Sequence, residues 1–439
     1  RDGLVQSLFD HLDLKYQAYA PTVAFVNGEY WGIHNIRELN DAWGIQKNYG
    51  INRDSLIMME DNLDGQYQLI TGQAGEEASF IALKNFIGQN DLTIQSNYNY
   101  VTDHLDISNL IDYWSATAFT NKRNINHNQS YWKMRNGHPG SYVKEGQDGR
   151  WRFMASDFDG GFYDPYFDNL NFIITEMSDS IFKRLLTNSE FKQQFISRYA
   201  DLMNSSFDTQ RLLDRIDEIA AAIEPEMPRH IGRWRTPDNM QKWYDNIEEL
   251  RIFARARVDF QRAHVKSQFN LSGTHLLHAN VDDMSHGNIN VNSLFISSTL
   301  PGVSDQVYPW TGTYFENVPV TLTAIAKPGY KFVRWKEINS TSATITVNMT
   351  SDQTLTAMFE MDFSSQNGQL VLYPNPPLDG KVYMNDFYRV TVYDITGKEV
   401  LAEQTTKELN VSQLAKGIYF VRDETGLQAK FVVLNNFEY

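Results

Sequence analysis

The spacing of apolar residues changes abruptly at about residue 270 and divides the chain into parts of different fold class. Before it, short alternating runs mix with segments of helical spacing, which is almost continuous from Asp179 to Ser267. From about residue 275 onward, Thr, Val and aromatic residues alternate with the period of two that half-buried strands show. We therefore expect a multidomain protein in which an α+β domain precedes β-rich domains.

Composition limits the class of protein further. The 439 residues, 42% of them hydrophobic and 13% aromatic, suffice for about two to four globular domains. A net charge of −15 argues against a nucleic-acid partner, which would require a basic surface. Apolar runs stay shorter than the roughly 18 residues of a membrane helix, so we expect no membrane span. The absence of Cys excludes disulfides, thiolate metal sites and Cys nucleophiles.

Local signals place several elements in the first domain. The pair Asn27-Gly28 lies between two apolar runs and predicts a β-hairpin, because it supplies the positive φ angles of a two-residue turn. A short helix should follow through Trp43 and stop at Gly50. The other expected elements are strands over 55–59, 131–134 and 151–155 and helices over 76–87 and 107–120.

The last seventy residues form a β-rich segment. Val390 and Val392 alternate with polar neighbours, and turns are expected at Gly397 and Gly417. With the stretches 372–376, 390–398, 414–421 and 430–434, the segment resembles the C-terminal sorting domain of type IX secretion in Bacteroidetes. The resemblance implies a β-sandwich over 365–439 and handling by the type IX secretion machinery. It also implies a secreted or outer-membrane surface location.

The middle segment, 275–361, is a second β-rich part. Its runs 318–324, 328–335 and 354–359 resemble the internalin-B-type bacterial repeat, which implies a small grasp-like β module that acts as a spacer or binding module. Trp335 and Tyr330 either pack in its core, the use we favour, or form a ligand platform. Trp310 and Trp335 also leave open a surface glycan as partner.

The first domain, residues 1–268, resembles the CotH-type (spore-coat) kinase-like family. The resemblance rests on the stretches 27–38, 127–133, 151–162 and 250–254. It implies an atypical protein-kinase fold that uses ATP with Mg²⁺ or Mn²⁺. The chain begins at Arg1 without Met or a signal peptide, so we expect the N-terminal part of this domain, with the family's nucleotide-binding Lys, to be missing.

Asp157 and Asp159 are the candidate metal ligands. If the preceding strand continues through them, they face the same side at about 6.5–7 Å along the chain, and Phe158 points into the core. Two carboxylates so placed can share hard cations, and Gly160 and Gly161 then allow a tight turn beside a ligand. The alternative is a solvated turn after a strand.

Two further positions take their roles from the resemblance. Asn128 matches the family's Asn after the catalytic loop, where it completes the metal shell or fixes the loop. The alternative is an amide that stabilises a loop before a strand. Glu38 matches an acidic residue that is, by analogy, the partner of the nucleotide-binding Lys. The alternative is a surface carboxylate at the start of a helix, where the helix dipole favours negative charge.

The sequence departs from the family in the catalytic loop, where active members carry an Asp a few residues before the Asn. By alignment this position falls on Arg123 or, with a small shift, on Asn121. An Asn can orient a hydroxyl but cannot accept its proton, and an Arg can do neither. His127 is the remaining candidate base, although a His in a loop is more often structural.

Two functions follow. The first is an exported cell-surface protein whose kinase-like domain binds a divalent metal and ATP and phosphorylates protein Ser or Thr. The second is a catalytically inactive, pseudokinase-like surface scaffold, adhesin or carbohydrate-associated binding protein, which the missing Asp favours.

Overall fold

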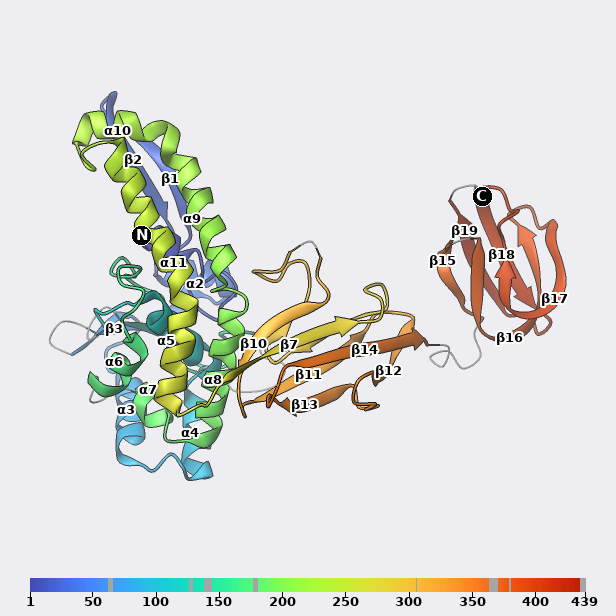
Figure 1. Cartoon of the computed structure of the whole chain (residues 1–439), viewed down its shortest axis with the longest axis horizontal. Helices are drawn as coiled ribbons and strands as arrows, with labels where there is room; N and C mark the ends of the chain where they lie inside the picture. The colour runs from blue at the N-terminus through green and yellow to red at the C-terminus, as the bar shows by residue number, and fades with distance from the viewer. Residues whose placement is uncertain are drawn as a thin grey trace. The chain divides into compact units, whose positions relative to one another are not determined.

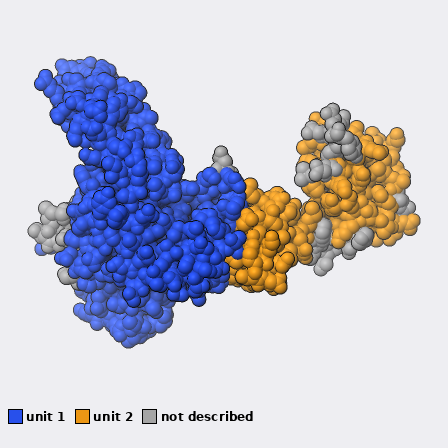
Figure 2. All heavy atoms as spheres, viewed as in Figure 1, with its two compact units in different colours: residues 1–279, 290–322, 346–354 blue, residues 280–289, 323–345, 355–439 orange. Residues whose placement is uncertain are grey.

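The computed structural model describes residues 1–61, 66–125, 129–137, 144–176, 181–304, 306–362, 370–378 and 380–434. The chain forms two compact units, coloured separately in Figure 2. Unit 1 comprises residues 1–279, 290–322 and 346–354, and unit 2 comprises residues 280–289, 323–345 and 355–439. Within the described part of the chain, no helix is both long and apolar enough to cross a membrane.

The N-terminal part of unit 1 mixes helices and strands, as the sequence predicts (Figure 1). Its strands are β1 (Tyr19–Val26), β2 (Glu29–Arg37), β3 (Leu56–Asp61), β4 (Tyr67–Thr71), β5 (Ser130–Met134) and β6 (Arg152–Met154). Its helices up to residue 185 are α1 (Asp2–Gln6), α2 (Ala42–Tyr49), α3 (Ala78–Gln89), α4 (Gln95–His104), α5 (Ile107–Thr120), α6 (Asn169–Glu176) and α7 (Ile181–Leu185). Those that follow are α8 (Ser189–Met203), α9 (Thr209–Ile223), α10 (Met227–Trp234) and α11 (Met240–Phe269).

The predicted hairpin is confirmed. Strands β1 and β2 pair antiparallel, and the turn residues Asn27 and Gly28 have φ angles of 51° and 82°. Helix α2 ends where expected, because Gly50 adopts the left-handed conformation that closes a helix. The helix expected over 107–120 is also confirmed, as α5.

An antiparallel sheet with strand order β4-β3-β5-β6 forms the core of this part. Aromatic side chains pack helices α3 and α5 onto it. The ring centres of Phe80 on α3 and Tyr131 on β5 are 4.4 Å apart. Those of Tyr113 on α5 and Phe153 on β6 are 4.9 Å apart. These rings are buried, so the apolar surface of the sheet is removed from water.

The helical half is interrupted at its three prolines. Pro237 lies between α10 and α11. Helix α9 ends at Ile223, and Pro225 and Pro228 occupy the first turns of the 3₁₀ helix (Glu224–Glu226) and of α10 that follow it. A proline is tolerated there because the first amides of a helix have no partner within the helix.

Helix α8 binds the segment 290–322 through a buried carboxylate. Asp201 accepts hydrogen bonds from the Ser293 hydroxyl (2.6 Å), the Tyr314 hydroxyl (2.9 Å) and the Asn292 amide (3.1 Å). Burial raises the pKa of Asp201, whereas the Ser293 and Asn292 donors oppose the shift. These bonds therefore tie part of the predicted β module into unit 1.

Asp201→Ala should destabilise unit 1, because it removes a carboxylate that accepts four hydrogen bonds, one of them from the buried Tyr314 hydroxyl. We expect the free energy of unfolding to fall by about 3 kcal/mol. Urea unfolding followed by Trp fluorescence measures this, with Asp214→Ala on α9 as a control. A loss below about 1 kcal/mol would show that Asp201 contributes little.

The described chain between 274 and 361 is all β. Its strands are β7 (Thr274–Val281), β8 (Gly287–Val291), β9 (Leu294–Phe295), β10 (Trp310–Phe315), β11 (Pro319–Ala326), β12 (Tyr330–Trp335), β13 (Thr344–Asn348) and β14 (Gln353–Met361). Antiparallel pairs join β7 with β10, β8 with β9, and β12 with β14.

Core packing is confirmed for the Trp residues of this segment. Trp335 is 0% exposed, and its indole N–H donates to the Ser342 carbonyl at 3.1 Å. Trp310 is also buried, whereas Tyr330 is partly buried and stacks on His286. The ligand platform of Trp335 and Tyr330 is therefore wrong for Trp335, and Trp310 likewise offers no exposed ring face to a glycan, because both Trp rings lie inside the fold.

The last five strands form one sheet with the order β15-β16-β18-β19, and β17 pairs with β16. Their bounds are β15 (Leu372–Leu378), β16 (Lys381–Asp394), β17 (Glu399–Asn410), β18 (Gly417–Asp423) and β19 (Gln428–Val433). The Asn375 side chain of β15 binds the backbone of Lys430 and Val432 on β19, which holds these two strands near each other. The all-β prediction is confirmed.

Candidate functional site

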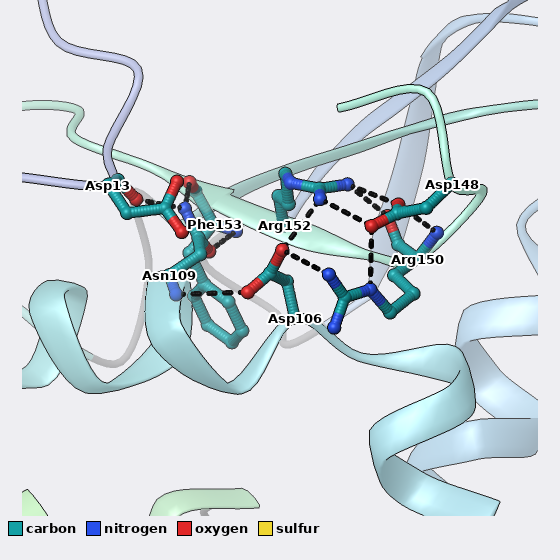
Figure 3. Close-up of polar contacts among 7 residues, drawn as sticks. All are labelled: Asp13, Asp106, Asn109, Asp148, Arg150, Arg152 and Phe153. Carbon is teal, nitrogen blue, oxygen red and sulfur yellow. Dashed lines mark hydrogen bonds and ion pairs between the residues drawn. The ribbon is translucent and has the colours of Figure 1, made fainter. Parts of the chain in front are cut away.

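The site begins at β6, which a buried charge network fixes to the start of α5 (Figure 3). Arg152 is 1% exposed and donates to Asp148 (2.8 Å) and Asp106 (2.6 Å), the N-cap of α5. Asn109 accepts from the Phe153 amide (2.6 Å) and donates to its carbonyl (3.1 Å). The strand that carries Arg152 and Phe153 is therefore held by both its side chains and its backbone.

The segment around Lys15 lies alongside the end of β6. Asn109 donates to the Asp13 carbonyl at 2.7 Å, and the Ala155 amide donates to the Lys15 carbonyl at 2.8 Å. A parallel bridge between Lys15 and Met154 also places the Lys15 backbone against the strand end. The Lys15 side chain therefore starts next to the residues that follow β6.

Lys15 and Glu38 form a buried ion pair. The Lys15 ammonium lies 2.9 Å from a Glu38 carboxylate oxygen, and the Lys15 side chain is 1% exposed. Burial lowers the pKa of Lys15, which the hydrogen bond to Glu38 opposes; burial would raise the pKa of Glu38, but Lys15 lowers it overall. Asn40 then donates to the Ala155 carbonyl (2.8 Å) and the Ser156 hydroxyl (2.9 Å). The segment that carries Glu38 is thereby held beside residues 155 and 156.

Asp157 and Asp159 lie together, but not for the reason that the sequence suggested. Strand β6 ends at Met154, and Asp157 has a φ of 53°, so a continuous strand through both residues is wrong. A turn brings the two side chains within hydrogen-bond distance instead. Burial is the main cause of the raised pKa of Asp157, and the side-chain hydrogen bond with Asp159 raises this pKa further. Phe158 is fully buried, which confirms that it points into the core.

The loop after α5 lies on this turn and is fixed by two buried side chains. Arg257 donates to four backbone carbonyls, those of Ala118, Phe119, Pro165 and Phe167. Asn169 donates to the carbonyls of Thr117 and Lys122. The end of α5 and the residues after it are therefore held in one conformation.

Two residues of this loop contact the carboxylate turn. The Asn124 amide donates to Asp157 at 3.3 Å, and the Lys122 ammonium donates to the Ser156 carbonyl at 2.6 Å. At Gly161 a side chain would press on the Thr120 carbonyl at 3.0 Å, so the glycine permits the close approach of the two loops. Asn124 and Lys122 are functional candidates that the sequence analysis did not single out.

Arg123 and Asn121, the positions aligned with the family's catalytic Asp, point toward another segment. Asn121 is 1% exposed, and its amide donates to the Asp164 carbonyl at 2.9 Å. Arg123 donates to the Asn121 side chain (3.2 Å) and to the Asp164 carboxylate (3.3 Å). Asn121 therefore serves to hold the loop in this structure, and Arg123 pairs with a carboxylate rather than supplying one.

The remaining predicted positions divide into those that the structure brings together and those that it does not describe. Asp157 and Asp159 lie together in the turn after Ser156, and Glu38 lies two residues before Asn40, which binds Ala155 and Ser156. Asn128 and the candidate base His127 lie outside the described residues. Lys15 was missed because the family's Lys was expected before Arg1, and no short sequence motif links a lysine to an acidic residue 23 positions later.

A divalent metal fits the carboxylate turn only with ligands from elsewhere. Among the described residues, no group of three or more His, Asp or Glu side chains could hold a metal ion. Mg²⁺ commonly binds through one or two carboxylates together with waters and substrate phosphates, and Asp157 with the exposed Asp159 offers two carboxylates. These two carboxylates therefore suit a divalent metal ion whose other ligands include a phosphate.

The family model described as CotH kinase protein matches residues 1–260, which is more than half of the chain. The chain belongs to the CotH kinase protein family. Comparison with the curated proteins returns no match.

Two further family models match the C-terminal half. Residues 300–362 match a divergent InlB B-repeat domain, and residues 371–434 match a secretion system C-terminal sorting domain. The predicted three-module composition is confirmed. The sorting domain shows that this CotH family protein is exported by the type IX secretion system to the cell surface or outer membrane.

Asp13, beside the charge network of Figure 3, should make stability depend on pH. Burial, followed by the charges of Asp106, Glu145 and Asp112, raises its pKa from 3.8 to about 8, although Arg152 opposes the shift. The folded protein then keeps a proton that the unfolded chain releases, so stability should fall as pH rises from about 4 to about 8.

Asp13→Asn removes this proton linkage. We expect the variant to gain stability over the parent protein at about pH 8.5 and to lose that gain at about pH 4. Urea unfolding midpoints at the two pH values measure the difference, with Asp214→Asn as the surface control. An equal difference at both pH values would contradict the raised pKa.

Proposed function

We propose that this exported CotH family protein binds ATP with Mg²⁺ or Mn²⁺ and phosphorylates Ser or Thr hydroxyls of a protein. The proposal rests on one observation above all. The chain segments that carry Lys15 and Glu38 bind Ala155 and Ser156, through the Lys15 carbonyl and the Asn40 amide, and these two residues lead directly into the Asp157–Asp159 turn. Phosphoryl transfer requires a positioned cation for the phosphates and carboxylates for the metal.

Each residue has a defined role in this proposal. Lys15 donates to phosphate oxygens, and Glu38 orients its ammonium within the buried pair. Asp157 and Asp159 hold the divalent ion, and Asn124 keeps the Asp157 carboxylate in place through its amide. The bound ion would supply positive charge to neutralise the phosphates.

Asp157→Ala should abolish phosphotransfer if the site works in this way. The full chain would be incubated with labelled ATP, Mn²⁺ or Mg²⁺ and a generic protein acceptor, and autophosphorylation would be measured in the same reaction. We expect a loss of at least about 100-fold, because the metal would lose one of its two protein carboxylates. Asp214→Ala on α9 controls for the loss of one acidic residue.

ATP binding has to be measured separately from transfer. A metal-dependent rise of the melting temperature with ATP, absent in Asp157→Ala, would support nucleotide binding even where transfer is not detected. Neither transfer nor metal-dependent ATP binding in the parent protein would refute the proposed function.

One observation favours a second function, that of an inactive surface scaffold with a kinase-like fold. Residues 121–125, where active relatives carry an Asp, contain no carboxylate. Arg123 occupies the aligned position and forms an ion pair with Asp164 at 3.3 Å. None of these five side chains can therefore accept the proton of a substrate hydroxyl in the way that a carboxylate does.

Arg123→Asp distinguishes the two functions. If the missing carboxylate limits transfer, the substitution should raise the transfer rate by about 100-fold, the usual contribution of a positioned general base. Arg123→Gln, which removes the charge without adding a carboxylate, is the matched control. Equal rates in both variants would show that the loop carboxylate does not limit the reaction.

A further inference from the structure

Lys122 places a buried ammonium against the carboxylate turn. The residue is 0% exposed and extends from the loop after α5. Its ammonium donates to the Ser156 carbonyl at 2.6 Å and lies 4.6 Å from the centre of the Phe158 ring. The charge is thus in contact with both neighbours of Asp157 in the chain.

The surroundings of this ammonium are acidic. Burial lowers the pKa of Lys122 to about 8, and the charges of Asp157, Asp61, Asp2 and Asp159 oppose that shift. One of these carboxylates, Asp2, also binds Arg37 in an ion pair. The acidic groups therefore limit the downward shift that burial imposes, without reversing it.

The carboxylate turn needs such a cation for a physical reason. Asp157 has a positive φ, which is an uncommon conformation for a residue with a side chain. It also lies close enough to Asp159 for a side-chain hydrogen bond, so the two like charges repel when both groups are ionised. A fixed positive charge beside the turn reduces this repulsion.

We propose that Lys122 is a built-in counter-ion of Asp157 and Asp159, a positioning residue that keeps the two carboxylates together before a divalent ion binds. The role of the ammonium in the metal-free protein stands on the contacts described above. Its role toward the ion rests on the proposed function. Lys122 would then act through the carboxylates and not on the phosphates.

A double-mutant cycle in the presence of a chelator tests the counter-ion role without any metal. Lys122→Met keeps the length of the apolar stem and removes the charge. We expect it to lower the melting temperature of the kinase-like domain by on the order of 10 °C, because it leaves the paired carboxylates without their counter-ion. In the Asp157→Asn background the same change should cost less than half of that shift.

Equal losses in both backgrounds would overturn the proposal, because Lys122 would then stabilise the fold independently of the carboxylate. If Lys122→Met alone does not fold, the proposal requires that Asp157→Asn restores folding, and failure to restore it counts against the proposal. Lys133→Met, which removes a partly buried lysine from β5, is the control.

Addition of Mn²⁺ separates this inference from the proposed function. Mn²⁺ should raise the melting temperature of Lys122→Met more than that of the parent protein, since the ion replaces the missing charge. A rise in the parent but no larger rise in the variant would overturn the role of Lys122 toward the ion. No effect of Mn²⁺ on either protein, with or without ATP, would refute the metal site, while the double-mutant cycle in chelator still decides the counter-ion role.

Discussion

Arg152 lies fully buried between Asp106 and Asp148, and the candidate site follows directly from the strand that this arrangement fixes. A guanidinium in such a place is costly without partners, so loss of one carboxylate would destabilise the fold by about 3–5 kcal/mol. The same network carries Asn109, which binds the backbone of both Phe153 and Asp13. One polar cluster therefore sets the position of β6 and of the segment that leads to Lys15.

The candidate site beside this polar cluster contains buried charged groups that stabilise one another. Lys15 is buried with Glu38, and Lys122 is buried beside Asp157 and Asp159. Removal of one member of such a set leaves the other charge buried with less compensation from its surroundings. The loop position that would orient an acceptor hydroxyl lacks such a buried pair, because Arg123 forms an exposed ion pair with Asp164 there. Under the proposed function, the site thus offers more of the groups that would bind phosphate and metal than of those that would transfer a proton.

Local sequence signals predicted most of the elements. The Asn27-Gly28 hairpin, helix α5 and the stop of α2 at Gly50 follow from turn chemistry and apolar spacing within a few residues. The strand predicted through Asp157 was wrong, because the alternation of polar and apolar residues over 157–159 does not reveal that Asp157 adopts a left-handed conformation. The two carboxylates nevertheless lie close together, since residues two apart can meet through a turn as well as along a strand.

The sequence by itself determined the family, the export signal, the all-β character of the C-terminal half and the missing carboxylate at Arg123. These are properties of residue types and their local order. Only the tertiary structure decided that Lys15 pairs with Glu38, that Lys122 lies against the carboxylate turn and that Trp335 is buried. Contacts of this kind join residues far apart in the chain, and they form only when burial and charge compensation are settled together in the folded protein.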